Sequence, residues 1–99
     1  MKEFIMQEKQ SRKLGDKIEY FYEMQESNLL IQDLAKPIAD ILESQELTAA
    51  DILDSSDFLE RCDKILKLIK LYSFRDQQDA LAYVTYVLEL LAKRTSDIR

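Results

Sequence analysis

The scarcity of chain-breaking residues constrains this sequence more than any other feature. Its 99 residues include one glycine, Gly15, and one proline, Pro37. Tight β-hairpin turns need glycine, asparagine or proline at defined positions, so the chain has little with which to connect strands. Leucine, alanine, glutamate and lysine are abundant instead, and these residues favour helices. The sequence therefore predicts an all-α fold.

Apolar residues recur at helical spacing in three long segments. The first extends from about residue 2 to residue 34, the second opens near Phe58, and the third follows a break at 73–76 and extends to about residue 98. The residues predicted to face the core are Leu14, Ile18, Phe21, Tyr22 and Leu29 in the first segment, Phe58, Cys62, Ile65, Ile69 and Tyr72 in the second, and Ala80, Val84, Val87, Leu88 and Leu91 in the third.

Pro37 predicts a break between the first two segments, because proline disfavours helical geometry at the preceding Lys36. Residues 38–45 are then a short amphipathic connector, followed by a turn in which Thr48 accepts a hydrogen bond from the amide of Asp51. Residues 1–99 are predicted to be a single domain, a small antiparallel bundle of three main helices plus one short connecting helix. Whether the chain is complete or a fragment of a longer protein stays open.

Composition narrows the class of partner. The net charge of −5 argues against nucleic acid, whose phosphates require a basic face. Cys62 is the one cysteine, so the chain forms no internal disulfide and a reducing compartment is expected. No segment approaches the 18 or so apolar residues of a membrane span. We expect a cytoplasmic chain with protein partners and no membrane-spanning segment.

No residue pattern predicts catalysis. The sequence has no histidine and no second cysteine, and it lacks a glycine-rich phosphate loop. Carboxylate pairs such as Asp51 with Asp54 have the spacing of a solvated helix surface. Cys62 lies on an apolar stripe between Phe58 and Ile65, which favours a buried core thiol. We expect no enzyme activity, no catalytic residues, no cofactor and no metal.

Two helices carry a second apolar stripe, rotated away from the first. Either a small bundle buries both stripes internally, or one stripe is left for another chain, for which tyrosine and methionine are well suited. Under the second hypothesis the partner is another helical subunit, a single target protein or a second copy of this chain. The candidate partner-binding residues are Tyr20, Met24 and Ile31 of the first helix and Tyr83, Tyr86 and Leu90 of the last.

The three neighbouring rings of the first helix are predicted to divide between these stripes. Successive helical residues point about 100° apart, so Tyr20, Phe21 and Tyr22 cannot all face one core. Phe21 and Tyr22 are predicted to be the buried pair, and Tyr20 is predicted to face outward.

The segments KIEYFYEMQ, FLERCDKILKLIKLYSFRDQQDA and AYVTYVLELLAKRTSDIR, in this order, resemble the N-terminal region of the third subunit of the conserved oligomeric Golgi complex. The likeness covers residues 13–99. The order of Cys62 and Asp63 departs from the family, in which a Leu-Asp pair precedes the cysteine. The matching positions are Lys17, Ile18, Tyr20 and Phe21 in the first helix and Tyr83, Val87, Leu90, Lys93, Ile98 and Arg99 in the last.

The resemblance implies a part of a multisubunit tether for retrograde vesicle traffic, peripheral at the Golgi membrane, that acts by helix pairing without chemistry. A second interpretation is a small bacterial or phage helical binding protein, such as a bacteriocin immunity protein or an antitoxin, which neutralises one target by occupying it. A regulatory subunit of an enzyme is also open.

Overall fold

A computed structural model of the chain describes residues 14–24, 29–70 and 74–97. Every regular element in these ranges is an α-helix, which confirms the predicted all-α class. Residues 14–24 form the first helical segment, and α2 (Leu29–Ser44), α3 (Ala49–Leu53), α4 (Phe58–Ile69) and α5 (Gln77–Asp97) follow it. None of these helices is long and apolar enough to cross a bilayer. The rest of the predicted first helix, Tyr72, Ile98 and Arg99 lie outside the described residues.

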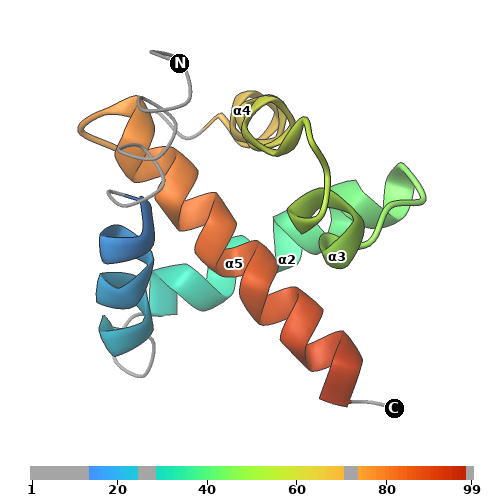
Figure 1. Ribbon diagram of the computed structural model, residues 1–99, viewed down its shortest axis with the longest axis horizontal. Coiled ribbons are helices and arrows are strands. Elements are labelled where there is room, and N and C mark those ends of the chain that lie inside the picture. Colours follow the sequence, from blue (N-terminus) through green and yellow to red (C-terminus); the bar gives the residue numbers. More distant parts are fainter. Residues whose placement is uncertain (1–13, 25–28, 71–73, 98–99) are drawn as a thin grey trace.

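Helix α5 occupies the centre of the fold. It contacts α2, α3 and α4, and Figure 1 shows it crossing the view between the segment 14–24 on one side and α3 on the other. The segment 14–24 is attached to α5 through aromatic rings, with ring centroids 4.9 Å apart for Phe21 and Tyr83 and also for Tyr22 and Tyr86. Lys17 adds an ion pair with Asp79. Residues 82–88 of α5 are all buried, so this helix packs against neighbours around its circumference.

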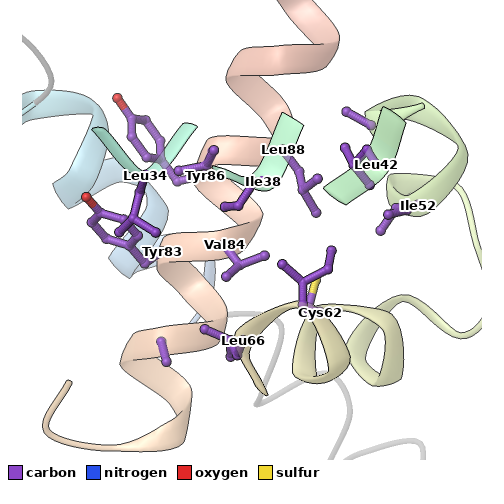
Figure 2. Packing of buried hydrophobic residues seen from close by; sticks show 14 of the residues in the cluster. Leu34, Ile38, Leu42, Ile52, Cys62, Leu66, Tyr83, Val84, Tyr86 and Leu88 are labelled. Atoms are coloured by element: carbon purple, nitrogen blue, oxygen red, sulfur yellow. The ribbon is translucent and has the colours of Figure 1, made fainter. Parts of the chain in front are cut away.

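One apolar cluster joins the helices. Cys62 and Leu66 extend from α4 into it, and Figure 2 shows both side chains on the side of α4 that faces α5. The predicted core residues of the last two helices are buried or packed against this cluster. Its buried members are Ile31, Leu34, Ile38, Leu42, Ala49, Ile52, Cys62, Ile65, Leu66, Ala80, Tyr83, Val84, Tyr86, Val87 and Leu88.

The predicted break at Pro37 is wrong, because α2 continues through Pro37 with Lys36 in helical geometry. Proline inside a helix costs about 3 kcal/mol through the lost hydrogen bond and the clash of its ring. Burial of each large aliphatic side chain contributes about 1.5–3 kcal/mol, so packing on both sides of the proline outweighs the local cost. The buried residues of α2 are Ile31, Leu34, Ile38 and Leu42.

The set of elements therefore differs from the predicted one. Residues 38–44 of the expected connector are the second half of α2, and the short helix is α3. The helix expected over 2–34 is represented by two described helices, 14–24 and α2. The antiparallel arrangement of three main helices stays a prediction.

Two local motifs fix the turn between α2 and α3. Glu46 has a φ of 56°, the left-handed conformation that usually takes glycine, and the amide of Leu47 donates to the carbonyl of Leu42 at 2.9 Å. This Schellman arrangement brings Leu47 back towards Leu42. The predicted cap is confirmed, since Thr48 Oγ1 accepts from the amide of Asp51 at 3.1 Å and the Asp51 carboxylate accepts from the amide of Thr48 at 3.2 Å.

The central position of α5 predicts that truncation of a leucine in α5 destabilises the protein much more than truncation of an exposed leucine in α4. Leu88→Ala should destabilise the protein by about 2–5 kcal/mol, because it leaves a cavity where no side-chain surface is exposed. The matched control Leu59→Ala, at an α4 position that is 39% exposed, should cost far less. Chemical denaturation followed by circular dichroism measures both values, and similar losses for the two variants would contradict the assigned core.

Candidate interaction surface

The six side chains proposed for partner binding do not form one exposed surface. Ile31, Tyr83 and Tyr86 belong to the buried core, each with 2% exposure or less. Met24 and Leu90 are partly buried against the same core, and Tyr20 is 55% exposed. The segment 14–24 covers Tyr83 and Tyr86 of α5, and α2 also contacts α5. A partner-binding role for the six residues stays a hypothesis.

The three neighbouring rings are distributed almost as predicted. Phe21 packs against Tyr83, and its centroid is 5.9 Å from that of Tyr86, so it joins the core. Tyr20 is the outward ring, as expected. The prediction that Tyr22 is buried is wrong: this ring is 38% exposed, because its hydroxyl extends to the Glu89 carboxylate and donates to it at 3.0 Å. Partial burial, followed by this contact, raises the pKa of Tyr22 to about 12.

The hydroxyls of Tyr83 and Tyr86 are buried without a hydrogen-bond partner in the described part of the chain. Desolvation, with smaller effects from Tyr86 and Asp33, raises the pKa of Tyr83 to about 12. Burial also raises the pKa of Tyr86. Both phenols are therefore neutral at physiological pH. In the contact between α5 and the segment 14–24 they act as aromatic rings more than as polar groups.

The side chain most suited to nucleophilic chemistry is embedded in the core. Cys62 is fully buried, as predicted, and desolvation raises the pKa of its thiol to about 12, so the thiolate is scarce at neutral pH. Across residues 14–24, 29–70 and 74–97, no group of three or more His, Cys, Asp or Glu side chains could hold a metal ion.

A groove with a volume of about 490 Å³ lies beside α4, between this helix and the turn that joins α2 to α3. We call it the α4 groove. Four aliphatic residues form its floor, of which three are buried core residues and Leu47 is half-buried. The Schellman turn at Glu46 places two of them together, and α3 and α4 supply the others. The floor residues are Leu42, Leu47, Ile52 and Ile65.

The rim of the α4 groove is mostly charged. Its residues recur at helical steps along one face of α4 and its cap, so this face points away from the buried Cys62 side. Leu68 stands among them with 58% of its surface exposed, next to Lys64 and Lys67. The rim residues are Asp57, Glu60, Arg61, Lys64, Lys67 and Leu68.

One hydrogen bond links α4 to α5 beside this face, and it shares a carboxylate with an ion pair inside α4. Gln77 of α5 donates to the Asp63 carboxylate at 2.9 Å, and Lys67 approaches the same carboxylate at 3.1 Å. The contacts with Lys67 and Gln77 lower the pKa of Asp63. Asp63 therefore stays ionised and links the first turn of α5 to the middle of α4.

Sequence reasoning missed the α4 groove. Lys64 and Lys67 of α4 and its C-cap Lys70 are all exposed. The available signal was Leu68, a leucine within that lysine-rich face. The floor could not be predicted, because it depends on the continuation of α2 through Pro37 and on the turn that follows.

Comparisons of this chain with protein-family models, with curated proteins and with solved structures found no match.

Aspartate substitutions at Tyr86 and Tyr20 test whether the first ring is packed in the core and the second lies on the surface. Tyr86→Asp should unfold the domain or lower its melting temperature severely, because a carboxylate would be buried without a partner. Tyr20→Asp, the same change at an exposed ring, should leave the melting temperature nearly unchanged. Thermal denaturation measures both, and a stable Tyr86→Asp variant would overturn the placement of α5.

Removal of the Tyr86 hydroxyl alone, in contrast to Tyr86→Asp, is not expected to destabilise the protein. Tyr86→Phe should leave the free energy of unfolding unchanged or raise it, because a hydroxyl without a hydrogen bond contributes only its desolvation cost. Tyr22→Phe is the control, since this hydroxyl donates to Glu89 and its loss should destabilise by about 0.5–1.5 kcal/mol. Urea titration of the three proteins compares them, and a clear loss for Tyr86→Phe would mean that its hydroxyl has a partner.

Proposed function

We propose that this chain is a non-enzymatic protein–protein interaction module. The α4 groove carries the proposal, because an apolar floor bordered by charges of both signs resembles the core and rim of a protein interface. Leu68 adds exposed aliphatic surface at the same place. A side chain from a partner could cover this surface without any change in the core. The buried tyrosines of α5 are not involved, because they pack against the segment 14–24.

The resemblance of residues 13–99 supplies the proposed setting. We propose that the partners are helical subunits of a multisubunit tether for retrograde vesicle traffic, located in the cytoplasm and peripheral at the Golgi membrane. Two residues of the resembling motif, Lys17 and Phe21, also attach the segment 14–24 to α5 through Asp79 and Tyr83. In this chain the motif thus pairs one helix with another, and we propose that the chain binds its partner subunits by helix pairing as well.

Affinity purification from the source cell tests this function. The intact chain, carrying a small tag, is expected to recover a defined set of helical tether subunits, identified by mass spectrometry. An unrelated helical protein of similar size and net charge is the control for non-specific capture by an acidic surface. Recovery of one small toxin or bacteriocin in place of tether subunits would contradict the Golgi setting and favour an immunity protein or antitoxin.

A further inference from the structure

We propose that the α4 groove binds an acidic amphipathic helix of a partner protein. This inference rests on the proposed function, since it names the partner chemistry of the same surface. It combines three features of the groove: its length along α4, the distribution of its charges, and a buried arginine nitrogen without an acceptor.

The groove has the length of a short helix. Its rim follows α4 from Asp57 to Leu68, eleven residues apart, which corresponds to about 16 Å at the rise of an α-helix. An amphipathic helix presents apolar side chains at steps of three and four over this distance. Leucine-like side chains on such a helix would lie over the floor at Ile65 and Leu47 and against the exposed Leu68.

The charges favour an acidic partner at the end of the groove near Leu68. The two carboxylates of the rim, Asp57 and Glu60, belong to the beginning of α4, and its three cations follow at 61, 64 and 67. Lys67 is shared with Asp63 at 3.1 Å, whereas Arg61 and Lys64 take part in none of the ion pairs of the described residues, so positive charge is concentrated at this end of the groove. A cationic end of the groove on a chain of net charge −5 favours an acidic segment of the partner, because opposite charges attract it to that end.

Arg61 indicates where a carboxylate would bind. Its Nε atom is buried and has no hydrogen-bond partner among the described residues, and none of the ion pairs in that part of the chain involves Arg61. A buried guanidinium donor without an acceptor is unfavourable, and a carboxylate is the acceptor that matches its planar fork. Glutamate or aspartate from the docked helix would pair with the guanidinium of the half-buried Arg61, beside Lys64.

The test uses three synthetic amphipathic helical peptides with the same leucine face and glutamate, glutamine or lysine on the flanking positions. Titration into the isotope-labelled full chain, followed by amide chemical shifts, measures affinity and location together. We expect the glutamate peptide to bind best, with shifts concentrated at residues 57–68 and in the turn 45–47. Non-specific attraction to a chain of net charge −5 would instead favour the lysine peptide.

Variants of α4 give the decisive comparison. Lys64→Glu, at an exposed position, should weaken binding of the glutamate peptide at least about tenfold and strengthen binding of the lysine peptide. Arg61→Gln should also weaken binding of the glutamate peptide, and Leu68→Asp should abolish it. Leu59→Asp is the matched control, since Leu59 is an exposed leucine of α4 outside the groove, and it should bind as the unmodified chain does.

Three outcomes would overturn the proposal: no saturable binding of the glutamate peptide, equal binding of all three peptides, or shifts away from the groove. Concentration-dependent shifts of the groove residues without peptide would identify a second copy of this chain as the occupant instead. Affinity purification with the Leu68→Asp chain separates this proposal from the function on which it rests. If that variant still recovers the tether subunits, the groove proposal fails and the interaction function stands.

Discussion

The burial of α5 around its circumference is the constraint on which the rest of this structure depends. Seven consecutive residues, 82–88, are buried, so no single neighbouring helix could cover them. Among them, Thr85 donates its hydroxyl to the carbonyl of Leu81 at 2.7 Å, within α5 itself. The segment 14–24, α2, α3 and α4 are therefore arranged around one helix that each of them contacts.

This constraint explains which sequence predictions succeed. The helical class, the cap at Thr48 and the core face of α4 follow from local patterns, and the structure has all three. The two apolar stripes of α5 were also visible in the sequence, but a stripe does not say whether its neighbour belongs to the same chain. Here Tyr83 and Tyr86 meet Phe21 and Tyr22, so internal packing accounts for this part of the second stripe.

Pro37 shows the limit of local reasoning most clearly. The propensity argument is sound for an isolated peptide, and it fails because the residues on both sides of the proline bury one continuous face. The same error concealed the α4 groove, whose floor includes Leu42 of α2 and Leu47 of the following turn. A site formed by the end of one helix and the face of another becomes visible only when both are placed in space. Leu68, an exposed leucine among lysines, was the one local sign of it.

The arrangement around α5 also explains why α4 has a face left for a partner. Helix α4 directs Cys62 and Leu66 towards α5, and Asp63 fixes its outer edge to Gln77, so its rotation about its own axis is set by the core. This rotation leaves Arg61, Lys64 and Leu68 beside a turn that covers them only in part. A domain of this size has few elements with which to cover every helix face, because its surface is large relative to its volume. The core thereby determines which face of α4 a partner can reach.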